Sequence, residues 1–174
     1  MSTTAVAQAP PAGRWLRTLL LVVAAAKALG ALYDIPGIFV VFMDDYATTL
    51  LLVAQIMLSV SLTFAPFIAI PAFLFARKGR LREATLALAA LVLLPWLLDD
   101  TTSFILHGPE FGASFFGVIL FAHHFIFPVL ALAGGWLAYT NRRPALAGVL
   151  VCLPTLFTWV TFVMFAIPIF IYGF

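Results

Sequence analysis

Long apolar stretches alternate with short polar segments along the whole chain. A transmembrane helix needs roughly 20 consecutive apolar residues, and this pattern predicts five such helices. They cover Trp15 to Tyr33, Thr48 to Phe75, Glu83 to His107, Gly112 to Tyr139, and Ala145 to Tyr172. The segments between them are too short to form a separate soluble domain. We therefore expect an all-α integral membrane protein, with a flexible tail over residues 1–13 and a single bundle of five transmembrane helices over residues 14–174.

The first apolar stretch allows a second interpretation. Arg14 and Arg17 precede a short apolar run that ends in three alanines, Ala24 to Ala26, and secretory signals with a small-residue cleavage site have the same pattern. The apolar sequence continues past Lys27 to Tyr33, as it does in an uncleaved anchor. We expect a retained helix, and cleavage stays the alternative.

The segment of residues 34–45, between the first two predicted helices, reads DIPGIFVVFMDD. It is too short to cross a bilayer and too apolar for a free loop. We expect it to lie along the membrane surface as an interfacial segment.

Composition supports the membrane assignment. Hydrophobic residues make up 64% of the 174-residue chain and charged residues 9%, and mean hydropathy is +1.15. So few charged side chains cannot cover a soluble surface. The formal net charge of +2 is too small to indicate a nucleic-acid partner, and the expected partner is the lipid bilayer. Cys152 is the single cysteine, which excludes an intramolecular disulfide and predicts a small core residue.

Charges of opposite sign are separated by loop. Basic residues outside the apolar stretches fall in three places: Arg14 and Arg17, then Arg77, Lys78, Arg80 and Arg82, then Arg142 and Arg143. The positive-inside rule makes these places cytoplasmic. The N-terminus is then cytoplasmic and the C-terminus outside, in a multi-pass protein of a bacterial-type inner (plasma) membrane.

The outer loops carry only acidic charges: Asp34, Asp44, Asp45 and Glu110. Together they predict an acidic outer rim that concentrates cations. For Asp44 and Asp45 the alternative is capping of the helix that follows, because helix N-termini favour acidic side chains.

Polar side chains within the predicted helices are costly in lipid and are functional candidates by default. The predicted ligand or proton site comprises Lys27, Gln55, Asp99, Asp100, Ser103, His107, His123 and His124. These residues fall in the outer half of the membrane on four of the five helices. The simpler alternatives are a buried ion pair between Lys27 and Asp99 or Asp100, and histidines that act only in packing.

Spacing adds detail to this site. Asp100, Ser103 and His107 follow at i, i+3 and i+7, so they share one helical stripe. His123 and His124 point about 100° apart on an α-helix. We therefore expect one of the two histidines to line the site and the other to pack.

Prolines and small residues predict features of packing. Pro128 lacks an N–H, so it leaves the His124 carbonyl without its helical donor. The same argument predicts breaks or bends at Pro66, Pro71, Pro95, Pro154 and Pro168. Two pairs of small residues predict close helix approach and self-association: Ala26 with Gly30, and Ser114 with Gly117.

Evidence for a cofactor in the sequence is weak. His123, His124 and Asp100 are candidate metal ligands, but the chain has no H-x-x-x-H, H-E-x-x-H or paired E-x-x-H motif. A bis-histidine haem needs imidazoles on two facing helices, and deep histidines occur on one predicted helix only. The sequence predicts no particular cofactor.

Three functions are compatible with these features. The first is a cation- or proton-linked binding or transport module with an outward-opening site of acidic residues and histidine. The second is a non-catalytic anchoring subunit of a larger membrane complex, whose partner is another membrane subunit or a second copy. The third is a membrane-embedded enzyme with a metal or haem site, which no reaction motif supports.

Overall fold

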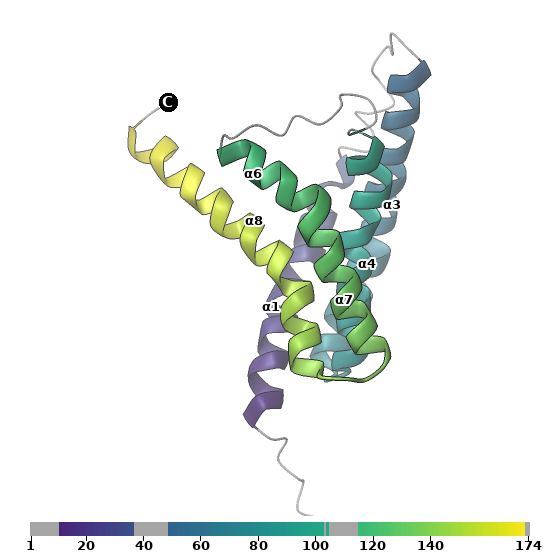
Figure 1. Ribbon diagram of the computed structural model, residues 1–174, viewed down its shortest axis with the longest axis vertical. Coiled ribbons are helices and arrows are strands. Elements are labelled where there is room, and N and C mark those ends of the chain that lie inside the picture. The colour runs from purple at the N-terminus through teal and green to yellow at the C-terminus, as the bar shows by residue number, and fades with distance from the viewer. Residues whose placement is uncertain (1–10, 37–48, 103, 105–114, 173–174) are drawn as a thin grey trace, which may run out of the picture.

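The computed structural model describes residues 11–36, 49–102, 104 and 115–172 (Figure 1). Every regular element in these ranges is helical. The elements are α1 (Pro11–Tyr33), α3 (Thr49–Arg77), α4 (Leu81–Pro95), the π-helical turn η1 (Trp96–Asp100), α6 (Phe115–Phe121), the π-helical turn η2 (Ala122–Ile126), α7 (Phe127–Tyr139) and α8 (Pro144–Tyr172).

Five of the resulting helices are long and apolar enough to cross a membrane, which confirms the predicted number. In this count η1 continues α4, and α6, η2 and α7 form one helix. The ends differ from the prediction by a few residues. The first helix begins at Pro11 rather than Trp15 and the second ends at Arg77 rather than Phe75. Proline suits the first turn of a helix because its missing N–H has no helical acceptor there.

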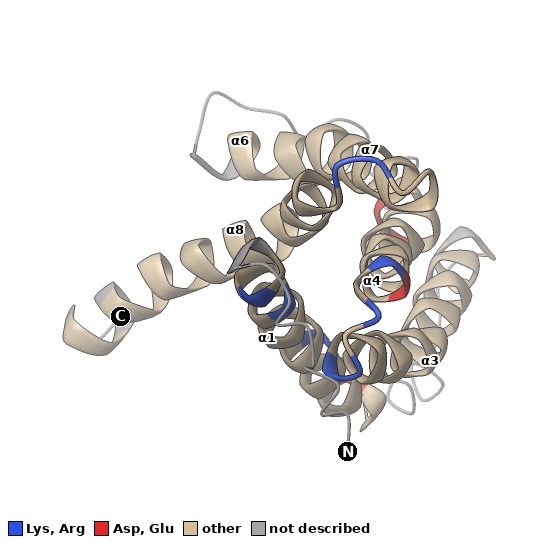
Figure 2. Ribbon diagram, turned by 90° about the horizontal axis from the view of Figure 1, so that it is seen from below, with Lys and Arg blue, Asp and Glu red and all other residues tan. Residues whose placement is uncertain are grey.

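The five helices follow one another around a ring in the order α1, α3, α4, α7 and α8, and α8 packs back against α1 (Figure 2). Helix α4 also contacts α1 and α8 across the ring. Each helix thus packs against the helix before it and the helix after it around the ring, and all five helices border the interior.

Apart from Lys27, the Lys and Arg residues lie at one end of this ring, the end from which Figure 2 is viewed. We call it the basic end. It holds the start of α1, the α3–α4 turn and the α7–α8 turn (Figure 1). A guanidinium N–H of Arg17 donates to the carbonyl of Arg77, and one of Arg82 donates to the carbonyl of Tyr139 at 2.9 Å. Both acceptors lie at helix C-termini, where cations are favoured.

Three residues with a left-handed backbone make the turns at the basic end: Gly79, Asn141 and Arg143. Gly79 has φ +76°, and the N–H groups of Gly79 and Arg80 donate to the carbonyls of Ala76 and Phe75 at 3.1 and 2.9 Å. This pair of bonds is a Schellman cap, which stops α3. Asn141, with φ 54°, occupies the same position after α7. The role of Gly79 was missed in the sequence analysis.

Close packing is concentrated toward the basic end. The largest fully buried side chains are Leu20, Val23, Leu88, Val151 and Cys152, so the core position expected for Cys152 is confirmed. A Cβ built on Gly134 of α7 meets Val151 Cγ2 at 2.6 Å and the Ala147 carbonyl oxygen at 2.9 Å on α8. The two helices can approach this closely because Gly134 has no side chain.

Packing is looser at the opposite end. Figure 1 shows the second half of α8 leaning away from the bundle. No described side chain of α8 after Thr155 is buried. The helices therefore pack closely at the basic end, and α8 diverges from the bundle at the other end.

Two packing predictions need correction. A Cβ on Gly30 meets nothing within 4 Å, so Ala26 and Gly30 do not mark a close helix approach. Small residues permit such contact, but their spacing does not show whether another helix lies opposite. Helix α3 also continues through Pro66 and Pro71, so neither proline breaks this helix. Ser114 lies outside the described residues.

Candidate functional site

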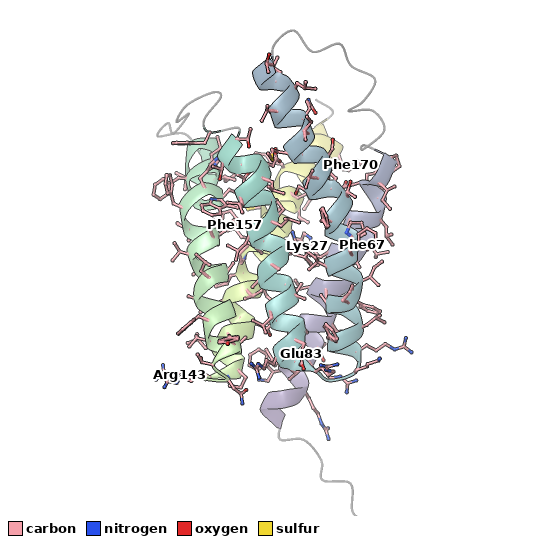
Figure 3. The ribbon with its side chains drawn as sticks, turned by 90° about the vertical axis from the view of Figure 1, so that its right-hand side faces the viewer. Lys27, Phe67, Glu83, Arg143, Phe157 and Phe170 are labelled. Atoms are coloured by element: carbon pink, nitrogen blue, oxygen red, sulfur yellow. The ribbon has the colours of Figure 1, made fainter. Side chains whose placement is uncertain are left out.

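Two adjoining cavities meet at Lys27 in the interior of the bundle. The larger has a volume of about 360 Å³ and is lined by Lys27, Asp34 and Asp99 among others. The smaller, of about 210 Å³, is lined by Lys27, Asp100 and His123 among others. Figure 3 shows Lys27 midway along the bundle, between Glu83 near the basic end and Phe170 near the opposite end. We call the two spaces together the Lys27 cavity.

Helix α1 determines the direction of the larger cavity. Lys27 and Asp34 are seven residues apart, almost two full turns, so they share one face with an axial separation of about 10 Å. Both line the cavity, and Asp34 is exposed while Lys27 is only partly exposed. The cavity therefore extends from the middle of the bundle toward the end opposite the basic residues.

The π-helical turn η1 places the two aspartates. It begins directly after Pro95, which cannot donate a backbone hydrogen bond. A π-helical turn inserts one extra residue and changes the direction of the side chains that follow. Asp99 lines the larger cavity and Asp100 the smaller one. The two adjacent carboxyl groups therefore line different parts of the Lys27 cavity.

The π-helical turn η2 separates the two histidines. His123 lines the smaller part of the Lys27 cavity and lies edge-on to Phe127, with ring centroids 4.8 Å apart. His124 lines a different cavity of about 150 Å³ with Trp96 and Phe104. Its Nδ1 lies 2.9 Å from the Leu120 carbonyl oxygen. Of the two histidines, the Lys27 cavity receives only His123.

A hydrogen bond joins η1 to η2. The indole N–H of Trp96 donates to the carbonyl of His124 at 2.9 Å. The missing N–H of Pro128 predicts that this carbonyl lacks its helical donor, and in the structure the carbonyl accepts from Trp96. The bond fixes the relative position of the two turns that carry Asp99, Asp100 and His123.

The ionisable groups around the Lys27 cavity have no protein partners in the described part of the chain. Lys27, Asp99, Asp100 and His123 form neither a hydrogen bond nor an ion pair with any described residue, and the described ion pair of the chain, Arg80 with Glu83 at 2.7 Å, lies at the basic end. The ion pair considered for Lys27 with Asp99 or Asp100 is therefore not formed. Unpaired polar groups inside a protein require water or a ligand, and the cavity has room for several waters.

Helix α8 contributes to the site, which the sequence analysis missed. Thr155 and Thr158 line both parts of the cavity, and Ser61 of α3 lines the larger part. Isolated Ser and Thr in an apolar helix usually bond to their own backbone, so their presence in the sequence does not indicate a site. The available signal was the spacing of Thr155, Thr158 and Trp159, which puts all three on one helical face.

Other predicted residues do not join the site. The Gln55 side chain lines neither part of the cavity, and its Oε1 is buried with no hydrogen-bond partner among the described residues. Ser103, His107, Asp44, Asp45 and Glu110 lie outside the described residues, as does most of the expected interfacial segment. Of the expected acidic rim, the structure places Asp34.

The described residues contain no group of three His, Cys, Asp or Glu side chains that could hold a metal ion. The candidate set of His123, His124 and Asp100 is not assembled, because the two histidines line different cavities. Both described histidines also belong to one turn, so they do not provide the facing imidazoles of a bis-histidine haem site.

Comparison of the chain with family models, with curated proteins and with solved structures finds no match. Its function therefore has to be inferred from the cavity and its chemistry.

Proposed function

We propose that this protein is a multi-pass protein of a bacterial-type inner membrane and acts as a proton- or cation-linked binding or transport module. The observation that carries the proposal is the Lys27 cavity. Lys27, Asp34, Asp99, Asp100 and His123 line two adjoining cavities that share Lys27. Groups of this kind inside a membrane mark ion pathways and proton relays.

The charges in the cavity favour a cation or proton as the species that enters. Three carboxylates outnumber the single ammonium of Lys27, and an excess of one charge in a cleft concentrates counter-ions. A histidine is the side chain that ordinarily changes charge near neutral pH. We propose that an incoming proton or cation is held by Asp99, Asp100 and His123, and that Lys27 limits the net charge of the loaded site.

The packing supports access from the outside. Buried side chains fill the basic end, while α8 diverges from the bundle at the opposite end (Figure 1). With the basic end in the cytoplasm, as the positive-inside rule requires, the cavity opens away from the cytoplasm. Pathways that serve one side of a membrane at a time need this kind of asymmetry.

The proposal predicts proton movement that depends on the two aspartates of η1. Purified protein in liposomes loaded with a pH-sensitive dye should dissipate an imposed pH gradient, and Asp99→Asn combined with Asp100→Asn should slow this at least about tenfold, because neutral amides cannot take up a proton. Glu83→Gln, which changes a carboxylate at the basic end, should leave the rate unchanged. Equal rates for both variants and the wild type, or no flux by the wild type under any cation gradient, would contradict the proposed function.

The proposed orientation has its own test. A reporter enzyme that is active only outside the cytoplasm should be active when fused after Phe174 and inactive when fused after Lys78 in the α3–α4 turn. A second reporter that works only in the cytoplasm should give the reverse pattern. Cytoplasmic activity after Phe174 would overturn the five-span topology.

A further inference from the structure

Two buried hydroxyl groups differ from the other buried hydroxyls of the described helices. Four Ser and Thr side chains are buried: Ser59, Ser61, Thr85 and Thr155. Ser59 and Thr85 donate to backbone carbonyls one turn earlier, both at 2.8 Å. Ser61 and Thr155, each only 4% exposed, make no hydrogen bond with any described residue. Back-bonding is the usual arrangement of these residues in a helix, so the two free hydroxyls require another partner.

Both free hydroxyls line the larger part of the Lys27 cavity. Ser61 belongs to α3, Thr155 to α8 and Lys27 to α1. Three helices therefore present unused hydrogen-bond donors to one space, and one of these donors is a cation. Donor sets that combine an ammonium with hydroxyl groups suit a carboxylate, whose oxygens accept several charge-assisted hydrogen bonds.

The same space also holds unpaired acceptors. Asp34 and Asp99 line it, and a simple anion would be repelled by them. A simple cation would leave Lys27, Ser61 and Thr155 without acceptors. A ligand that carries both charges satisfies both sets of groups, and a volume of about 360 Å³ is within the range of small-molecule sites.

We infer that the larger part of the Lys27 cavity binds a small zwitterion of the amino-acid type. Its carboxylate accepts hydrogen bonds from Lys27, Ser61 and Thr155, and its ammonium group donates to Asp99 or Asp34. The inference rests on the proposed function, because it names the solute that moves together with the proton. The smaller part, with Asp100 and His123, is left for proton exchange.

The test compares alanine with two fragments of it. Propionate lacks the ammonium group and ethylamine lacks the carboxylate. In titration calorimetry on the purified full-length protein, alanine should bind at least about tenfold more tightly than either fragment, because each fragment leaves charged groups of the cavity unpaired. Equal affinity for all three, or no saturable binding of any, would overturn the inference.

Hydroxyl variants locate the ligand. Ser61→Ala and Thr155→Val should each weaken alanine binding about tenfold, since each removes a hydrogen bond to a charged group. The matched control is Ser59→Ala, whose hydroxyl is already bonded to the Gln55 carbonyl and lines neither part of the cavity. Thr155→Ser retains the hydroxyl and should retain binding. If Thr155→Ser loses as much affinity as Thr155→Val, the hydroxyl is not a ligand donor and the inference fails.

The liposome experiment separates this inference from the proposed function. Proton flux that alanine does not change, measured on protein that does not bind alanine, overturns the zwitterion site and leaves proton transport standing. Absence of proton flux and of alanine binding overturns both. Proton flux that alanine accelerates in the wild type, but not in Lys27→Met, supports both.

Discussion

Replacing Gly134 by alanine is expected to destabilise the bundle by about 1–3 kcal/mol, the range for overpacking a tight contact. The new Cβ would lie 2.6 Å from Val151 Cγ2 and 2.9 Å from the Ala147 carbonyl oxygen. A side chain can rotate away, but the carbonyl oxygen belongs to the backbone of α8. Helices α7 and α8 must therefore move apart, and the loss outweighs the gain of about 1 kcal/mol that alanine brings to a helix.

Gly30→Ala is the matched control for this prediction. It is the same substitution inside a helix, and its Cβ meets nothing within 4 Å. It should stabilise the protein by up to about 1 kcal/mol through helix propensity alone. Denaturation in mild detergent, followed by circular dichroism, measures both changes. Shifts of the same sign and size would show that α7 and α8 do not meet as closely as described.

Leu20→Ala is expected to cost about 2–5 kcal/mol, the range for deleting a fully buried leucine side chain. Leu20 is fully buried where α1 enters the core. The change removes packing contacts between α1 and the surrounding core side chains.

Leu29→Ala on the same helix should be close to neutral, because Leu29 is 69% exposed. The same denaturation experiment compares the two variants. If both cost the same, the stability of α1 does not come from the packing near the basic end. A large difference would show that packing near the basic end stabilises α1 in the bundle.

The site was predicted in part. Lys27, Asp99, Asp100 and His123 stand out in the sequence because charged and imidazole groups are rare in apolar helices. The two buried hydroxyls of Ser61 and Thr155 do not stand out, because such residues are common in helices and usually bond to their own backbone. Their free state is visible only when the hydrogen bonds of each are known.

Gln55 is the opposite case, a residue that the sequence analysis included in the site and the structure does not place there. A polar residue inside an apolar helix was assigned to the site by depth alone, yet it lines neither part of the Lys27 cavity. Depth follows from the rise of 1.5 Å per residue, whereas the direction of a side chain depends on how its helix is rotated against its neighbours. The sequence therefore indicates how far along its helix a residue lies better than it indicates the direction of the side chain around the helix axis.

The sequence by itself determined the number and order of the membrane-length helices and the gathering of basic residues in three segments. These properties depend on local runs of residues, which set where a helix starts, how long it is and where it stops. The tertiary structure decided which side chains share a space. The close approach at Gly134 and the entry of Thr155 into the cavity both arise from contacts between residues far apart in the chain. Such contacts set the rotation and tilt of each helix, and local sequence leaves both free.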